Sequence, residues 1–351
     1  MLLTYKYRIK NRSAKTVLRR HAFAVNQVWN YCCAQQCDVE SRYRAGAKPR
    51  KWASHYDLQK LCKGAGATFG VHQQTVGGVC RTFVQSRDKL KHAPAFRKSY
   101  GMRRSLGWVP FEGQSRQVKD GVVTYLGKRF YLWGTKRRPI PATARGGCFV
   151  EDALGRWYVC ITVEAERHPA VGKKAIGIDL GLKSFAALSD GRKIEAPQFY
   201  RRHEQKLAMA QRAGNRQRAK RLHAKIKECR KDFLHKVSTE LTSQNAIIVV
   251  GNVNASALAS KSVFDAGWSS FRNMLRYKAR EYQGVDEKFT TVTCSACGSR
   301  CGPQGQRGLR VRTWECSACG VSHDRDVNAA RNILAFARSA ARPAEENRRA
   351  A

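Results

Sequence analysis

The hydrophobic and polar positions of this chain follow three successive patterns. The first is a strand pattern followed by a helix pattern. Residues 3–9 alternate, with apolar side chains at every second position and Thr4, Lys6 and Arg8 between them, which predicts a half-buried strand. Ser13 is of a type that caps helix N-termini. Behind it, apolar residues recur at helical spacing, at Leu18, Ala22, Val25, Val28, Trp29 and Cys32. We therefore expect a strand followed by a long amphipathic helix.

The second pattern is built from short strands. Residues 38–104 are predicted to be mostly helical, with Gly and Pro breaks and a basic run from Arg81 to Arg104. Near Ser105 the pattern of apolar and polar residues changes from helical to strand-like. Two hairpins are predicted after it, with Val122–Tyr125 and Phe130–Trp133 around Leu126–Arg129, and Phe149–Val150 and Trp157–Val163 around Asp152–Gly155. We expect a small antiparallel sheet or barrel that includes the first strand, with the helical segment inserted.

The third pattern, from Ala175 onward, alternates buried strands with basic helices. The sequence predicts strands over 175–179, ending at Asp179, over Phe185–Leu188 and over Ile247–Val250, and a helix over Ser270–Glu281. A long basic stretch between them carries an apolar stripe, formed by Leu222, Ile226, Cys229, Phe233, Val237 and Leu241. The Arg and Lys residues beside this stripe suit a phosphate backbone, but a solvated helix face explains them equally well.

The charge of the chain narrows the classes of partner. The 351 residues carry 66 Lys and Arg against 26 Asp and Glu, a formal charge of +40. A compact protein with this excess repels itself unless a polyanion compensates it, so we expect a nucleic-acid partner. Charge alone does not exclude a ribosome-associated or RNA-coating protein. A run of about 18 apolar residues is absent, which predicts no membrane span, and the N-terminus lacks the apolar block of a signal peptide.

Four of the 13 cysteines have the spacing of a structural zinc site. Cys294 and Cys297 form one CxxC pair, Cys316 and Cys319 form another, and 18 residues separate the pairs. Each pair lies in a Cys-Ser-Ala-Cys-Gly turn, so two thiolates from each turn can bind one tetrahedral Zn²⁺. Four cysteine ligands leave no open position, and the zinc is therefore expected to be structural. The nearby Cys301 is interpreted as a bystander.

A second chemistry is suggested by acids at the ends of predicted elements. Asp179 ends a buried strand, and Asp324 and Asp326 open a helix directly after the zinc-ligand spacing. Carboxylates from a first strand and a late helix can meet over one face of a mixed sheet and hold two Mg²⁺ ions for attack of water on a phosphodiester. Taken singly, Asp179 could be a strand-end cap and Asp326 a helix N-cap.

These motifs together resemble those of the TnpB (OrfB) family carried by insertion sequences, which are RNA-guided DNA endonucleases related to type V CRISPR effectors. The resemblance covers nearly the whole chain and is clearest at 177–181, 261–268, 289–298 and 323–333. It implies a multidomain α/β protein. Residues 1–10 and 105–172 would form a wedge-type β-barrel, with a helical recognition lobe inserted over 11–104. A split RNase H-like (RuvC) nuclease domain would occupy 173–290 and 323–351, interrupted by a zinc ribbon at 291–322.

The resemblance assigns the first and third RuvC carboxylates to Asp179 and Asp326. Family members usually place the second, a Glu, at the end of the strand Ile247–Val250, where this chain has Gly251. Some relatives place it before the ribbon instead, which here is Glu287. Two other acids are close in sequence. We expect Asp265 to cap a helix start and Glu281 to lie on the exposed face of the helix Ser270–Glu281.

The expected function is that of an RNA-guided DNA endonuclease of a transposable element, with Mg²⁺ held by Asp179, Glu287 and Asp326 and Zn²⁺ held by the four cysteines. Its partners would be a guide RNA and target double-stranded DNA. The protein would be a monomer within a ribonucleoprotein, in the cytoplasm of a prokaryote and associated with the nucleoid. The alternative is a nuclease-dead, RNA-guided DNA-binding protein that occupies its DNA site and represses or marks it. A basic zinc-ribbon protein without a guide is a third possibility.

Overall fold

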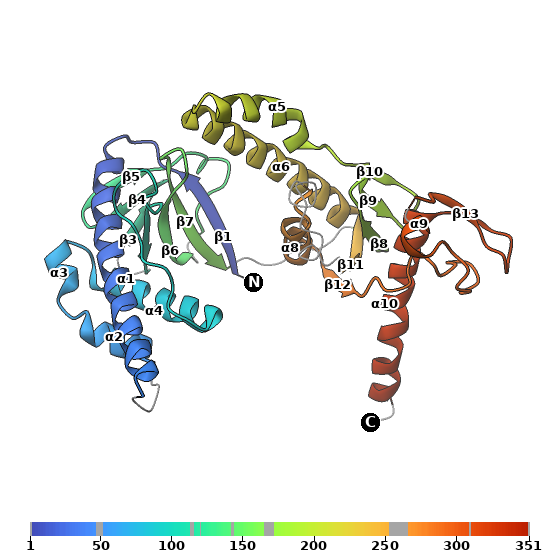
Figure 1. The fold of residues 1–351 in the computed structure, drawn as a ribbon, viewed down its shortest axis with the longest axis horizontal. Coiled ribbons are helices and arrows are strands. Elements are labelled where there is room, and N and C mark those ends of the chain that lie inside the picture. The colour runs from blue at the N-terminus through green and yellow to red at the C-terminus, as the bar shows by residue number, and fades with distance from the viewer. Residues whose placement is uncertain are drawn as a thin grey trace. The chain divides into compact units, whose positions relative to one another are not determined.

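The computed structural model describes residues 2–46, 52–112, 116–119, 121–141, 144–164, 172–252, 266–308 and 310–349. The chain divides into two compact units, Met1–Ala165 and Glu166–Ala351, each of which has its own sheet and helices (Figure 1). None of the helices in these described ranges is long and apolar enough to cross a membrane. The two units are described separately.

The first unit is built on a four-stranded antiparallel sheet that contains the N-terminal strand. Its strands are β1 (Leu2–Arg8), β2 (Trp108–Phe111), β6 (Ala144–Glu151) and β7 (Trp157–Glu164), in the order β1-β7-β6-β2. Strand β1 pairs with β7 from Leu2↔Glu164 to Arg8↔Tyr158, so the two ends of this unit's chain lie side by side in the sheet. The prediction that the first strand joins the later sheet is confirmed.

A separate three-stranded sheet contains β3 (Arg116–Lys119), β4 (Val122–Tyr125) and β5 (Lys128–Tyr131). The predicted hairpin is present, but its second strand begins at Lys128 and not at Phe130 as expected. Tyr125 pairs with Lys128, so the turn contains only Leu126 and Gly127. Both have positive φ, 49° and 71°, as the tight turn between two right-twisted strands requires.

Helices α1 (Ala14–Arg44), α2 (His55–Leu61), α3 (Ala65–Phe69) and α4 (Gln73–Leu90) complete the first unit. The predicted apolar stripe of α1 is buried from Leu18 to Cys32, as expected. Ser13 occupies the N-cap position, but its side chain accepts no capping hydrogen bond. The mostly helical segment predicted over 38–104 is confirmed up to Leu90, but the residues from there to 104 are not helical. Lys91 ends α4 with a φ of 61°, and the rest of the basic run is irregular because Pro94 excludes helical backbone before it.

The second unit is built on a five-stranded mixed sheet. Its strands are β8 (Lys174–Leu180), β9 (Ser184–Leu188), β10 (Lys193–Glu195), β11 (Asn245–Gly251) and β12 (Glu281–Val285), in the order β10-β9-β8-β11-β12. Strand β11 is parallel to both β8 and β12, whereas β9 is antiparallel to β8 and β10. The strands predicted at 175–179, 185–188 and 247–250 are therefore confirmed, with slightly longer bounds.

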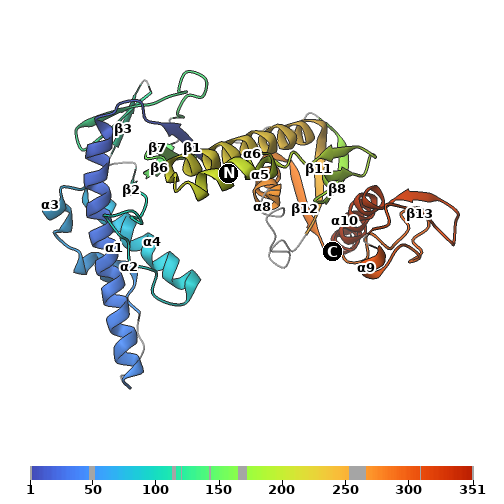
Figure 2. The same ribbon diagram turned by 45° about the horizontal axis from the view of Figure 1, so that its top comes forward.

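Helices cover both faces of this sheet, and the alternation of side chains along the strands decides which residue meets which helix (Figure 1). On one face, Ile248 and Val250 pack with α6 (Arg216–Gln244) and α8 (Trp268–Lys278). On the other face, Ile247 and Val249 pack with α10 (Arg325–Arg349). Helix α5 (Phe199–Arg212) packs against α6 (Figure 2). Gly177 of β8 lies under α10, since a Cβ there would meet the carbonyl oxygen of Ala330 at 2.1 Å.

The helix predicted over Ser270–Glu281 is shorter than expected. It ends at Lys278, and Glu281 is the first residue of β12, which pairs in parallel with β11 from Ile247↔Glu281 to Gly251↔Val285. The interpretation of Glu281 as a helix residue is therefore wrong. Pairing with a buried neighbouring strand outweighs the helix propensity of Glu281. A short α9 (Gly305–Gly308) and the hairpin β13 (Thr313–Glu315) with β14 (Ser322–Asp324) complete the unit.

Candidate active site and metal centre

The first candidate ligand, Asp179, lies on the sheet face that α10 covers. It is two residues beyond Gly177 on β8, so its side chain points to the same face. The neighbouring β11 is in register, with Val250 opposite Ile178, which places Gly251 beside Asp179. A side chain at 251 would thus share the α10 face with Asp179. The end of β11 is the natural place for a second carboxylate, and this chain has no side chain there.

Glu287 fills that space from the next strand. A Cβ built on Gly251 would lie 2.0 Å from Oε1 of Glu287 and 2.6 Å from its Cγ. Strand β12 ends opposite Gly251 at Val285, and the amide of Thr290 and its hydroxyl both donate to the carbonyl oxygen of Glu287, at 3.1 and 2.8 Å. This turn holds Glu287 over the end of β11. The carboxylate is therefore displaced in sequence but sits in the same region of space.

The third candidate, Asp326, is at the start of α10. Asp324 is the residue that caps this helix, because its Oδ1 accepts hydrogen bonds from the amides of Asp326 and Val327, both at 3.1 Å. Lys193 also binds Asp324, at 2.6 Å. The explanation of Asp326 as an N-cap is therefore wrong, and its carboxylate is not needed to satisfy the helix terminus.

Asp179 senses the charges of the other two carboxylates, although the oxygens of the three do not all lie within 4.8 Å of one another in the structure. Burial raises the pKa of Asp179 to about 8, and the neighbouring Glu287 and Asp326 contribute to that rise, whereas Arg325 opposes it. Burial likewise raises the pKa of Glu287 to about 7. Oε1 of Glu287 is buried and has no hydrogen-bond partner among the described residues. A divalent cation would relieve both the repulsion and this unpaired oxygen, so the donor set fits Mg²⁺.

Three basic side chains surround Asp326 and were not anticipated from the sequence. Arg312 Nη1 lies 3.4 Å from Oδ1 of Asp326, Arg325 Nε lies 3.5 Å from the same oxygen, and Lys193 Nζ lies 4.0 Å from Oδ2. Arg312 and Arg325 flank the cysteine hairpin and Lys193 is on β10, so only the folded chain brings them together. They partly neutralise the carboxylate, and they place positive charge where a phosphate would bind.

The four predicted zinc ligands form one group. The sulfur atoms of Cys294, Cys297, Cys316 and Cys319 all lie within 4.8 Å of one another, with 3.7 Å between Cys294 and Cys319. Gly298 and Gly320, which follow the two pairs, have φ of 77° and 72° and permit the tight turns. Two other residues border this group, since Cys301 Sγ is 3.1 Å from Cys316 Sγ, and His323 Nε2 is 3.0 Å from Cys294 Sγ.

The cysteine group is tied to the helix that carries Asp326. The side-chain amides of Asn328 and Asn332 on α10 each donate to the carbonyl oxygens of Thr290 and Thr293, at 2.7 to 3.2 Å. Asn328 also accepts from the amide of Ser295 at 2.8 Å. Both asparagines are buried. The same hydrogen bonds therefore fix the first cysteine turn, the Glu287 turn and the start of α10 relative to one another.

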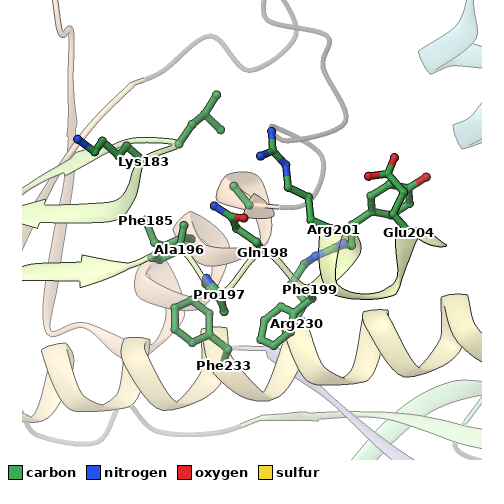
Figure 3. Close-up of a pocket in the computed structure, with 13 residues that line it drawn as sticks. Lys183, Phe185, Ala196, Pro197, Gln198, Phe199, Arg201, Glu204, Arg230 and Phe233 are labelled. Carbon is green, nitrogen blue, oxygen red and sulfur yellow. The ribbon is translucent and has the colours of Figure 1, made fainter. Parts of the chain in front are cut away.

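One pocket of this unit lies away from these carboxylates. It has a volume of about 600 Å³ and lies beside α5 and α6, with Lys183, Gln198, Phe199, Arg201 and Phe233 among its lining residues (Figure 3). None of the three candidate carboxylates lines it. The candidate carboxylate site is therefore separate from this pocket. Residues 261–265, including Asp265, are outside the described residues.

Comparisons with known proteins find relatives for large parts of this chain. Residues 158–262 match the OrfB_IS605 family, described as "Probable transposase", and residues 268–333 match the domain described as "Cas12f1-like, TNB domain". The chain is 39% identical over 223 residues to the "Putative RNA-guided DNA endonuclease" of Streptomyces pristinaespiralis, which covers 56% of this chain and 54% of that protein. It is 31% identical over 224 residues to InsQ of Escherichia coli (strain K12), named in the same way, which covers 53% and 55%.

The chain thus spans about half the length of these curated relatives. A solved structure, the cryo-EM structure of the Cas12f1–sgRNA–target DNA complex, aligns over 92% of this chain and 83% of that chain, with a TM-score of 0.58 and 13% identity. The protein therefore has a Cas12-like α/β fold. Over these stretches the chain is similar to proteins of the TnpB (OrfB) family and to the Cas12f1-like domain.

Proposed function

We propose that this protein is an RNA-guided DNA endonuclease of a transposable element, and that Asp179, Glu287 and Asp326 form its active site. The observation that carries the proposal is the position of Glu287, whose carboxylate occupies the space above Gly251, beside Asp179. A TnpB-family chain without a second carboxylate would favour the nuclease-dead alternative. This chain supplies one from the turn after β12, and the raised pKa of Asp179 supports its proximity to the other two.

The three carboxylates would hold two Mg²⁺ ions, and the metal would supply charge stabilisation for hydrolysis of a phosphodiester. Asp179 contributes from a rigid central strand and Asp326 from the capped start of α10, so both are held by regular structure. Glu287 contributes from a turn fixed by Thr290. Arg312 and Lys193 pair with Asp326 in the structure. When DNA binds, these two cations would release the carboxylate and bind phosphate oxygens.

The architecture supports the domain organisation that the resemblance implies. The sheet that contains β1 would be the wedge barrel, and α1 to α4 the recognition lobe. The five-stranded mixed sheet with helices on both faces would be the RuvC-like nuclease domain, and the four-cysteine group a zinc ribbon inserted into it. Zn²⁺ would be structural, because all four of its positions would be occupied by thiolates.

The partners we propose are a guide RNA and target double-stranded DNA, bound by one protein chain in a ribonucleoprotein of the prokaryotic nucleoid. The surface of α6 supports a phosphate-binding role. Its exposed positions include Arg216, Arg218, Lys220, Arg221 and Lys225, while Ile226, Leu234 and Leu241 are buried. A positive groove can hold a guide–target duplex by its shape and charge, and base pairing then reads the sequence.

Cleavage of a guide-matched DNA by single variants tests the active site and separates it from the nuclease-dead alternative. Asp179→Asn, Glu287→Gln and Asp326→Asn should each reduce Mg²⁺-dependent cleavage by at least about 100-fold, because loss even of outer-shell partners costs 10–100-fold. Guide and target binding should persist, and a triple variant should lose little more than a single one, because the ligands act as a unit.

Glu281→Gln is the control, because Glu281 is an exposed acid at the start of β12, and this variant should cleave normally. Undiminished cleavage in Glu287→Gln would remove that residue from the site. A wild type that stays inactive under all guide and metal conditions would favour the nuclease-dead protein.

A further inference from the structure

A second group of cysteines lies in the first unit, away from the zinc-ligand spacing. Cys32 is on α1, Cys62 follows the end of α2, and Cys80 is on α4. Their sulfur atoms all lie within 4.8 Å of one another. The residues are 0, 5 and 0% exposed, so the three thiols meet in the interior where the three helices pack. The sequence separations show no recognisable motif, and only the fold brings these thiols together.

The spacing of the sulfurs is compatible with a metal site. With metal–sulfur bonds of about 2.3 Å, three sulfurs in a plane around one ion are about 4.0 Å apart. Buried cysteines are often only small apolar core residues, and Cys33 shows what such a residue does here. It is the next residue on α1 and equally buried, but its thiol donates to the carbonyl oxygen of Pro94 at 3.4 Å. Cys32, Cys62 and Cys80 instead point at one another.

Metal binding would replace the thiol protons of the group. A metal cation would bind all three sulfurs as thiolates, which is the usual coupling of metal binding to thiol deprotonation.

We propose that Cys32, Cys62 and Cys80 bind one soft, thiophilic metal ion in three-coordinate geometry, with Cu(I) as the preferred ion. In the described part of the chain, no fourth His, Cys, Asp or Glu joins the group. Structural Zn²⁺ requires a fourth ligand, whereas all-thiolate sites with fewer ligands suit Cu(I). Binding is a ligand exchange without oxidation, in which Cu(I) leaves its carrier and the thiol protons pass to the buffer. The ion would link α1, α2 and α4.

The test is an anaerobic titration of the full chain with Cu(I) from a colorimetric chelator, with zinc release followed at the same time. The wild type should take up one Cu(I) without losing zinc. Cys62→Ala should bind it at least about 100-fold more weakly, since it lacks a direct ligand. Cys33→Ala is the matched control, an adjacent buried cysteine outside the group, and it should bind as the wild type does. A parallel titration with Zn²⁺ should show no equivalent uptake beyond the zinc already bound.

Equal Cu(I) binding by Cys62→Ala and the wild type would overturn the proposal, as would uptake that occurs only with stoichiometric release of zinc. If Cys62→Ala does not fold, the wild type still decides the question. A short pulse of thiol alkylation in guanidinium, with one equivalent of Cu(I) bound, should label Cys33 fully and leave Cys32, Cys62 and Cys80 protected. Labelling of all four to the same extent would show that the three thiols are core residues only.

Discussion

At the scale of single residues, the candidate active site depends on a pair of positions, Gly251 and Glu287. A glycine at the end of β11 leaves room, and the Glu287 side chain enters that room from the turn after the neighbouring strand. Position 251 has no positive φ, so the backbone itself would accept a side chain there. What excludes one is the carboxylate of Glu287. The two positions are therefore alternatives for placing the same functional group.

This leads to a relocation experiment. Glu287→Ala should be inactive in guided cleavage, and addition of Gly251→Glu to that variant should restore cleavage to within about tenfold to 100-fold of the wild type, because a 1 Å misplacement of a catalytic group costs about 100-fold. Gly251→Gln with Glu287→Ala has the same shape without the charge and should stay inactive. Restoration by the Gln variant would show that the space beside Asp179 does not require a carboxylate. If both variants fold and the Glu variant does not restore cleavage, positions 251 and 287 are not alternatives for the same group.

A buried ion pair in the first unit gives a prediction of pH-dependent stability. The Glu151 side chain is 0% exposed and accepts two hydrogen bonds of 2.7 Å from Arg104, and one of 3.1 Å from the amide of Gly107. Burial raises the pKa of Glu151, but the hydrogen bonds from Arg104 and Gly107 outweigh it and hold this pKa below its ordinary value. The stabilisation is therefore present above the unfolded-state pKa and is lost as pH falls through the folded-state pKa.

Glu151→Gln should lower the free energy of unfolding by about 3 kcal/mol at pH 7, since it leaves the partly buried Arg104 unpaired. Glu112→Gln is the control, because the Arg81–Glu112 pair is 51% and 42% exposed and should be worth under about 1 kcal/mol. Urea unfolding of the three proteins at several pH values measures this. The difference between Glu151→Gln and the wild type should shrink as the solution is acidified below the ordinary carboxyl pKa of about 4. A constant difference would contradict the assigned charge.

At the scale of elements, periodicity predicted what local sequence determines. The stripe on α1 repeats at helical spacing and the strands β8, β9 and β11 are short apolar runs, and the structure has them where they were expected. The end of α8 was missed because Ala279, Arg280 and Glu281 favour helix, whereas the chain leaves the helix after Lys278 and pairs with β11 from Glu281 onward. The position of Glu287 above Gly251 depends on that strand. The cluster of Cys32, Cys62 and Cys80 was not predictable from sequence spacing either, because tertiary packing alone brings these residues together.

The cysteine hairpin is the element whose stability we expect to depend on metal. The wild type should contain one tightly bound zinc per chain, and Cys294→Ser should lose it and destabilise the second unit by several kcal/mol, since the binding free energy of a structural zinc is about 10–16 kcal/mol. Cys301→Ser is the control, because its thiol lies outside the group of four. Elemental analysis and thermal unfolding measure both effects. Zinc-free but folded wild type, or loss of zinc in Cys301→Ser, would require a different set of ligands.

At the scale of the whole molecule, the charge of +40 sets the behaviour towards nucleic acid. Each Lys or Arg that neutralises a phosphate releases bound counterions, so affinity for the guide RNA should fall by at least about 1,000-fold between 50 and 200 mM salt. Replacement of the exposed Arg218, Arg221 and Lys225 on α6 by Gln should reduce the slope of log affinity against log salt by up to about 0.7–0.9 for each phosphate that these residues neutralise. Equilibrium binding measured over a salt series checks both, and an unchanged slope would place the RNA away from α6.

Cleavage after a change of guide sequence tests directly whether a bound RNA directs the active site to DNA. The protein is purified with its RNA, the RNA is sequenced, and its targeting segment is replaced by one complementary to a second DNA site. Mg²⁺-dependent cutting by the wild type should move to the new site and disappear from the old one, and Asp179→Asn should cut neither. Cutting that ignores the change of guide, or copurified RNA without any enriched sequence, would contradict RNA-guided cleavage.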